Sequence, residues 1–128
     1  MSMRVLIADD AGFVRDLLRE ACLSLGFQVV GEARDGREVV DMASRLRPDV
    51  IVMDLVMPYW NGLEATEKVL EIRPGTHIIA CSSMDDELTI KQAADKGCQA
   101  FLRKPFSKQS IQSVFQQIEI QRRGVKHA

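Results

Sequence analysis

The chain has 128 residues, the length of one domain whose core needs neither disulfides nor a structural metal. Its 17 basic and 18 acidic residues give a net charge of −1, so nothing in the composition points to a nucleic-acid or membrane surface. No stretch approaches the ~18 apolar residues of a membrane span, and the short apolar run after Met1 lacks a signal-peptide pattern. Three cysteines without C-x-x-C spacing are typical of buried cytosolic thiols, so we expect a cytoplasmic protein.

The first half of the chain alternates between strand and helix patterns. Residues 5–8 are a short apolar run, typical of a strand buried on both faces, and we expect a second strand at residues 28–33. The helix between them is indicated by an apolar stripe that Gly26 stops, made of Phe13, Val14, Leu17, Leu18, Ala21, Cys22 and Leu25. Asp35 and Glu38 resemble a capping box, which predicts that a second helix begins there and ends before Pro48.

The second half continues the same alternation. The expected strands are 50–53, 77–81 and 100–102. The expected helices run from Asn61 to about Arg73, from Glu87 to Lys96 as the weakest of the five, and from Ser107 onward. We expect the tail, 122–128, to be frayed.

Five strands alternating with five helices through short connections require right-handed crossovers between parallel neighbours. Continuously apolar strands indicate that helices cover both faces of the sheet. We therefore predict that residues 1–128 form a single doubly wound α/β sandwich. Periodicity does not give the order of the strands, but ligands of such sheets bind outside the carboxyl ends of the strands.

Polar side chains gather where the predicted strands end. Asp9 and Asp10 follow the first strand, Asp54 the third, Ser82 and Ser83 the fourth, and Lys104 the fifth. Taken singly, Asp9 or Asp10 and the two serines are explained as helix caps, Asp54 as a cap of the loop after its strand, and the lysine as a solvated charge. Taken together they share one edge, where one lysine cannot offset three carboxylates. A divalent cation can, and hard oxygen ligands favour Mg²⁺.

This arrangement resembles the receiver domain of two-component response regulators, from Arg4 to about Gln121. The resemblance is carried by Asp9-Asp10, by Asp54-Leu55-Val56-Met57-Pro58 with Gly62, by Ser82, and by Lys104-Pro105-Phe106. It implies a flavodoxin-like fold with the strand order 2-1-3-4-5. Asn61 departs from the aspartate that often precedes the glycine, but both residues cap helices well.

The resemblance also implies a role for each site residue. Asp54 would accept a phosphoryl group from the phosphohistidine of a histidine kinase or phosphotransfer protein. Asp10, Asp54 and the backbone carbonyl of Val56 would bind Mg²⁺ directly, and Asp9 through water. Lys104 would pair with the phosphoryl group, Ser82 would hydrogen-bond to it, and Phe101 would be a switching aromatic.

We expect the phosphoryl group to switch the face made by the fourth helix, fifth strand and fifth helix, where a target protein would bind. The chain would assist only its own phosphorylation and dephosphorylation, and would be a monomer, with dimerisation on phosphorylation as the alternative. We favour a stand-alone regulator of the chemotaxis type. The alternative is a receiver domain excised from a longer regulator with a DNA-binding or enzymatic output domain.

Two other classes fit the sequence poorly. A flavodoxin-type electron carrier needs a phosphate-binding loop after the first strand, where Asp9 and Asp10 would repel a cofactor phosphate. Phosphatases of the haloacid dehalogenase type carry an Asp-x-Asp motif after a strand, but here Val56 stands where the second aspartate would be.

Overall fold

The computed structural model describes residues 2–127, with side chains described for residues 2–123. Ten elements alternate along the chain, and their bounds are β1 (Arg4–Ala8), α1 (Gly12–Ser24), β2 (Gln28–Ala33), α2 (Gly36–Leu46), β3 (Val50–Asp54), α3 (Gly62–Ile72), β4 (His77–Ser82), α4 (Glu87–Lys96), β5 (Ala100–Arg103) and α5 (Lys108–His127). Because α5 includes the segment from Arg122 to His127, the tail continues a helix; its fraying stays a prediction, and Ala128 lies outside the described residues.

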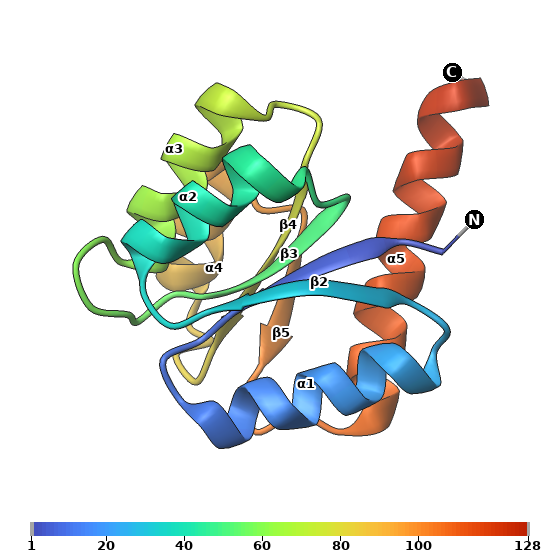
Figure 1. Ribbon diagram of the computed structural model, residues 1–128, viewed down its shortest axis with the longest axis horizontal. Coiled ribbons are helices and arrows are strands. Elements are labelled where there is room, and N and C mark those ends of the chain that lie inside the picture. The colour runs from blue at the N-terminus through green and yellow to red at the C-terminus, as the bar shows by residue number, and fades with distance from the viewer. Residues whose placement is uncertain (1, 128) are drawn as a thin grey trace.

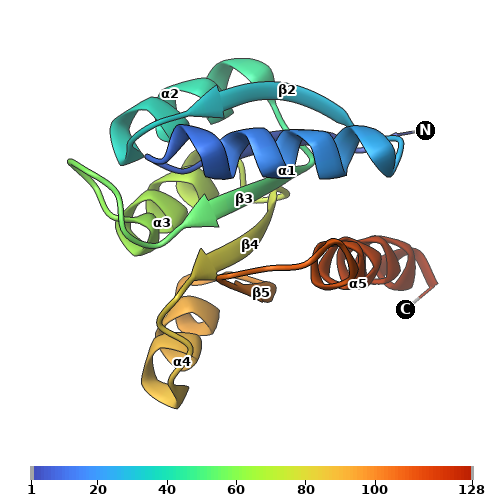
Figure 2. The same cartoon turned by 90° about the horizontal axis from the view of Figure 1, so that it is seen from below.

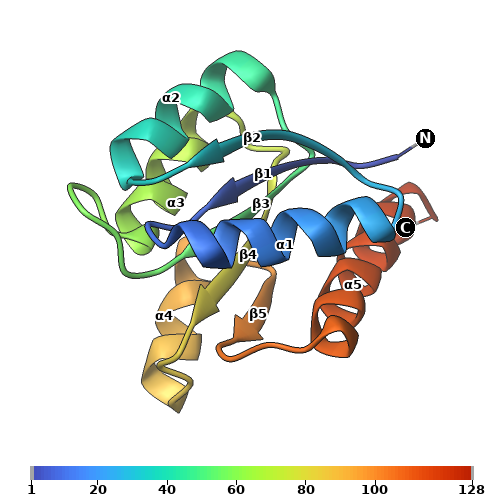
Figure 3. The ribbon, with the colours of Figure 1, turned by 60° about the horizontal axis from the view of Figure 1, so that its bottom comes forward.

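The five strands form one parallel sheet in the order β2-β1-β3-β4-β5, which confirms the predicted fold. The arrows of β1, β2, β4 and β5 in Figure 3 point to the same side of the molecule. The order reverses between β1 and β3, because β2 lies on one side of β1 and the later strands lie on the other. Ligands of such sheets bind at this reversal, outside the carboxyl ends of β1 and β3.

Helices cover both faces of the sheet, as the continuous apolar strands predicted. Helices α1 and α5 lie on one face, and α2, α3 and α4 lie on the other (Figure 1). Along β1, Val5 and Ile7 contribute to the core under α1 and α5, whereas Leu6 and Ala8 contribute to the core under the other three helices. Figure 2 shows α2 and α4 at opposite ends of the second layer, with α3 between them.

Side chains at the helix ends explain where most helices begin. Asp35, Asn61 and Asp86 accept hydrogen bonds from main-chain N–H groups in the first turns of α2, α3 and α4. The two caps predicted at Asp35 and Asn61 are therefore confirmed. Gly97 ends α4 with a left-handed backbone, at a φ of 111°.

The apolar stripe of the first helix is not uniformly buried. Phe13 and Leu17 belong to its apolar stripe, yet they are 71% and 50% exposed. Only Val14, Leu18, Ala21 and Cys22 are buried along α1. The apolar stripe of α1 is therefore only partly buried, because two of its members lie at the rim of the sheet's carboxyl edge. Among the described residues, no helix combines the length and the apolar character needed to cross a bilayer.

Candidate functional site

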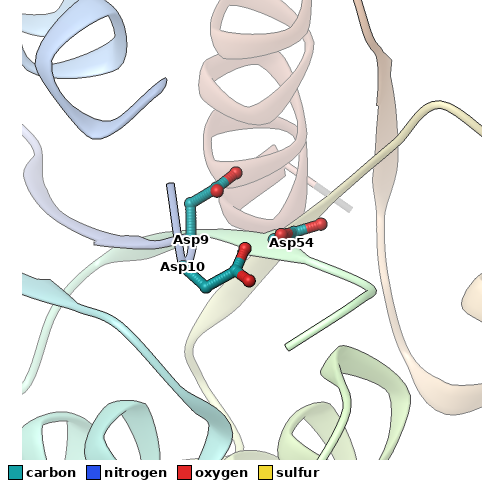
Figure 4. A group of neighbouring side chains, drawn as sticks. All are labelled: Asp9, Asp10 and Asp54. Atoms are coloured by element: carbon teal, nitrogen blue, oxygen red, sulfur yellow. The ribbon is translucent and has the colours of Figure 1, made fainter. Parts of the chain in front are cut away.

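Three carboxylates meet at the point where the strand order reverses. Asp9 and Asp10 directly follow β1, and Asp54 is the last residue of β3, which pairs with β1 in parallel register. One carboxylate oxygen from each aspartate lies within 4.8 Å of one from each of the others (Figure 4). Asp9 and Asp54 are buried, at 1% and 4% exposure, whereas Asp10 is exposed. The structure thus brings together the three acidic residues that the sequence assigned to this edge.

Lys104 lies between two of these carboxylates. Its Nζ is 2.8 Å from Oδ2 of Asp9 and 3.4 Å from Oδ1 of Asp54. The Lys104 main-chain N–H donates to the carbonyl of Ser82, which holds the residue beside the end of β4. Burial alone would lower the pKa of Lys104, but its hydrogen bond to Asp9 and the charges of Asp54 and Asp9 outweigh burial and raise it. The lysine is therefore a fixed positive charge in the site.

The charge of Asp54 is poorly compensated without a further cation. Its pKa is raised from 3.8 to about 6, first because it is buried and then because the Asp9 carboxylate is close. The charge of Lys104 and an N–H donor from Val56, 3.2 Å from Oδ1, oppose the rise without cancelling it. The ionised form of Asp54 is thus destabilised by its surroundings, and its pKa lies close to physiological pH.

The donor set fits a hard divalent cation. Two buried carboxylates and one exposed carboxylate have oxygens within 4.8 Å of one another, close enough to bind one metal ion. The single lysine beside them leaves an excess of negative charge. Mg²⁺ usually takes one or two carboxylates and keeps several waters, which the exposed position of Asp10 permits. We identify Asp9, Asp10 and Asp54 as the residues able to hold it.

The simpler explanations of the acidic pair and the serines do not hold. The N-cap residue of α1 is Ala11, whose side chain cannot accept a hydrogen bond from the N–H groups of the first turn. Asp9 Oδ1 instead accepts from the Ala11 N–H at 2.9 Å, which shapes the turn after β1. Helix α4 is capped by Asp86, so neither Ser82 nor Ser83 caps it.

Ser82 ends β4 beside the main chain of Lys104, and Phe101 lies on β5 opposite Ala80. Ser82 is 3% exposed, and its hydroxyl accepts a hydrogen bond from the Met84 N–H. It comes one residue after Cys81, which is paired with Asp54 in the sheet. Phe101 is half-buried on β5 and packs against the core under α4.

Arg15 is a component of the site that the sequence analysis missed. Its guanidinium donates to the main-chain carbonyl of Asp9 at 2.7 Å and lies 3.5 Å from Glu32 of β2. It therefore ties the backbone under the acidic pair to the neighbouring strand. A basic residue one turn into α1 was the available signal, but its partner on β2 depends on the strand order.

Two exposed apolar side chains border the site. Phe13 and Leu17 line a groove of about 310 Å³, together with Phe106, Pro105 and Lys104. Because Lys104 also contacts Asp54, this groove opens beside the acidic cluster. Exposed aromatic and aliphatic side chains at such a place are typical of a protein-binding surface.

Comparisons with known proteins agree with this geometry. The model of the response regulator receiver domain family matches residues 5–116. The chemotaxis protein CheY of Thermotoga maritima is 41% identical over 106 residues, which are 83% of this chain and 88% of that protein. The similarity thus spans most of both chains.

Solved structures give the same result. The receiver domain of AraT, a response regulator from Geobacillus stearothermophilus, superposes with a TM-score of 0.87 at 30% identity, covering 98% of this chain and 99% of that one. CheY in the CheX–CheY–BeF3–Mg complex from Borrelia burgdorferi superposes with a TM-score of 0.82 at 28% identity, covering 88% of this chain and 89% of that one. The chain belongs to the response regulator receiver domain family.

Proposed function

We propose that Asp54 is the phosphoacceptor of this response regulator, and that it receives its phosphoryl group from the phosphohistidine of a histidine kinase or phosphotransfer protein. One observation carries this assignment: Asp54 is a buried carboxylate with Lys104 3.4 Å away and two further carboxylates within ligand distance. Such a residue combines a nucleophilic oxygen, a cation for the transferring oxygens and a metal-binding set.

The chemistry needs only a transfer between two nucleophiles. A carboxylate oxygen of Asp54 attacks phosphorus, the P–N bond to the imidazole breaks, and the imidazole takes up a proton as it leaves. Lys104 pairs with a phosphoryl oxygen that it meets beside Asp54, while Asp9 keeps the ammonium in place. When bound, Mg²⁺ supplies positive charge for the phosphoryl oxygens; Asp9, Asp10, Asp54 and the carbonyl of Val56 would hold it. The chain turns over no other substrate in this scheme.

The test is phosphorylation of the wild-type chain and of Asp54→Asn with acetyl phosphate and Mg²⁺, followed by intact mass and peptide mapping. We expect the wild type to gain one phosphoryl group on the peptide that contains Asp54, and the variant to gain none. Undiminished labelling of Asp54→Asn would refute the assignment. Asp41→Asn, a surface carboxylate in α2 that pairs with Arg45, is the matched control and is expected to label like the wild type.

The groove lined by Phe13, Leu17 and Phe106 supports a docking site for the phosphodonor protein. A protein donor must bring its phosphohistidine to Asp54, so it has to cover the carboxyl edge of the sheet. The apolar groove lies on that edge beside Lys104 and offers contact area next to the reacting atoms. An apolar partner surface would bury Phe13 and Leu17, which are exposed in the free chain.

We propose that the phosphoryl group is read out on the face made by α4, β5 and α5. Ala93 is the only fully buried residue of α4, while Leu88 and Ile90 are 63% and 41% exposed. Helix α4 is therefore weakly anchored and able to shift at low cost. A target protein would contact the exposed polar residues of α4, namely Lys91, Gln92 and Lys96. Lys108 and Gln112 of α5, which we also expected on this face, instead line hollows against α1.

The chain is proposed to act in the cytoplasm as a single-domain switch, monomeric before phosphorylation. Its similarity along most of CheY supports this reading. A second arrangement is a receiver domain joined to an output domain, and the near-complete match to the receiver domain of AraT supports it. Asp54 has the same role in both arrangements.

A further inference from the structure

The loop between β3 and α3, residues 55–61, is pressed against the start of helix α2. A Cβ atom on Gly36, the first residue of α2, would lie 1.8 Å from the main-chain oxygen of Trp60 and 2.6 Å from its carbonyl carbon. Both atoms belong to the backbone, so no side-chain rotation relieves the overlap. Only glycine allows α2 and this loop to approach so closely.

Other contacts join the same two segments. The N–H of Gly36 donates to the carbonyl of Pro58 at 3.3 Å. The guanidinium of Arg37 lies over the ring of Tyr59, 4.6 Å from its centroid. Tyr59 itself has a left-handed backbone, with a φ of 67°. The tip of the loop is thus held by the first turn of α2 in a conformation that costs energy for a tyrosine.

The two ends of the loop are tied together at the phosphoacceptor. The N–H of Gly62 donates to the carbonyl of Leu55, and a Cβ on Gly62 would lie 2.2 Å from the main-chain oxygen of Asp54. Residues 54–62 therefore form a closed loop that contains both Asp54 and Val56. Because its base is closed and its tip rests on Gly36, a displacement at Trp60 has to be taken up by the residues that form the site.

We infer that Gly36 is a positioning residue for the phosphoacceptor loop. It acts through the backbone of Trp60 and sets where Val56 and Asp54 lie relative to Asp9 and Asp10. Its own backbone does not require glycine, because its φ lies outside the left-handed range. Alanine is the better helix former, so local propensity alone favours a substitution that the contact with the loop forbids. This inference rests on the proposed metal-binding and phosphoacceptor role of the site.

The experiment compares Gly36→Ala with Gly75→Ala, because a Cβ on Gly75 would meet nothing within 4 Å. Fluorescence of Trp60, the chain's single tryptophan, is recorded without metal, and Mg²⁺ binding is measured by calorimetry. We expect Gly36→Ala to change the Trp60 emission and to weaken Mg²⁺ binding by at least about tenfold, the effect of disturbing the support of metal ligands. Phosphorylation by acetyl phosphate falls in parallel, and Gly75→Ala matches the wild type in all three measurements.

A second variant covers the case in which Gly36→Ala does not fold. Arg37→Ala removes the contact with Tyr59 at an exposed position, and we expect Mg²⁺ binding weaker by about two- to fivefold. If a folded Gly36→Ala keeps the emission and Mg²⁺ affinity of the wild type, or if Gly36→Ala does not fold and Arg37→Ala binds Mg²⁺ like the wild type, the inference is overturned. Failure of the wild type itself to bind Mg²⁺ or to label at Asp54 would instead refute the proposed function.

Discussion

The ammonium of Lys104 lies 2.8 Å from the carboxylate of Asp9, a residue 95 positions earlier in the chain. The pair closes the site between the ends of β1 and β5, and the same ammonium is 3.4 Å from Asp54. In the unphosphorylated chain the Lys104 ammonium is therefore bound mainly by Asp9 and lies next to Asp54. A phosphoryl group on Asp54 would arrive within reach of a cation that is already desolvated and oriented.

Replacement of Lys104 tests how far the fold depends on this pair. Lys104→Met leaves Asp9 buried without its cation and removes the charge that lowers the pKa of Asp54. We expect a loss of about 3 kcal/mol in the free energy of unfolding at pH 7, the usual effect of removing one partner of a buried pair. Urea unfolding measures it, and Mg²⁺ should restore part of the loss. An unchanged unfolding free energy in metal-free buffer would contradict this account.

Asp54→Asn is expected to stabilise the metal-free chain near neutral pH. The folded-state pKa of Asp54 is about 6, above its ordinary value of 3.8, so the folded chain holds a proton that the unfolded chain releases between these values. The stability of the wild type therefore falls as the pH rises through this window, by up to about 3 kcal/mol for a shift of this size. Asparagine has the same size and no charge, so its curve lacks this fall.

The measurement is thermal or urea unfolding of both proteins from pH 3.5 to pH 8 in the presence of EDTA. The variant should be about 1–3 kcal/mol more stable at pH 7.5 and close to the wild type at pH 3.5. Adding Mg²⁺ should stabilise the wild type and leave the variant nearly unchanged, because binding to the folded state alone raises stability. A variant that is less stable at pH 7.5 would contradict the electrostatic origin of the shift.

The sequence predicted the elements closely because parallel strands covered on both faces are continuous apolar runs. The runs at 50–53 and 77–81 each lie within one residue of the observed strand. The carboxyl edge was predictable for the same reason, since each run ends at a polar residue. Strand order came from the family resemblance and not from periodicity, which carries no information about neighbours in a sheet.

Contacts that depend on tertiary approach were not predictable. Phe13 belongs to an apolar stripe at helical spacing and is nevertheless 71% exposed, because periodicity cannot distinguish a core position from the rim where a helix passes beyond the sheet edge. The contact of Arg15 with Glu32 requires β2 beside β1, and that of Gly36 with Trp60 requires α2 beside the loop after β3. Local sequence records neither of these distances.

The groove at α1 predicts a separation between protein and small-molecule donors. Phe13→Ser should slow phosphotransfer from the phosphorylated kinase by tenfold or more, since exposed aromatic anchors often contribute over about 1.4 kcal/mol to binding. Labelling by acetyl phosphate should be unchanged, because that donor needs no docking surface. Leu23→Ser, at an equally apolar and 58% exposed position near the other end of α1, is the control. Equal loss with both donors would place the defect in the site itself.

Ser82→Ala tests the route from Asp54 to α4. A phosphoryl group adds about −1.5 to −2 charges and strong acceptor oxygens. Ser82 comes directly after Cys81, which is paired with Asp54 in the sheet, so its hydroxyl can donate a hydrogen bond to a phosphoryl group on Asp54. In the free chain that hydroxyl accepts from Met84, so turning toward the phosphoryl group would release the start of the β4–α4 loop. Space vacated there lets the half-buried Phe101 turn inward and the weakly anchored α4 shift.

The energetics of such a switch are within reach of a few contacts. Moving an equilibrium from 1:99 to 99:1 needs about 5.5 kcal/mol, and each hydrogen bond to a charged group contributes about 1.5–3 kcal/mol. Ser82→Ala should therefore still take up phosphate on Asp54 while losing most of the shift in α4. Amide NMR spectra with and without beryllofluoride measure the shift, with Ser83→Ala, an exposed neighbour, as the control. If Ser82→Ala still shows the spectral changes in α4 and Phe101, the signal leaves the site by another route. If the wild type shows spectral changes only in residues 54–62, the α4 switch is ruled out.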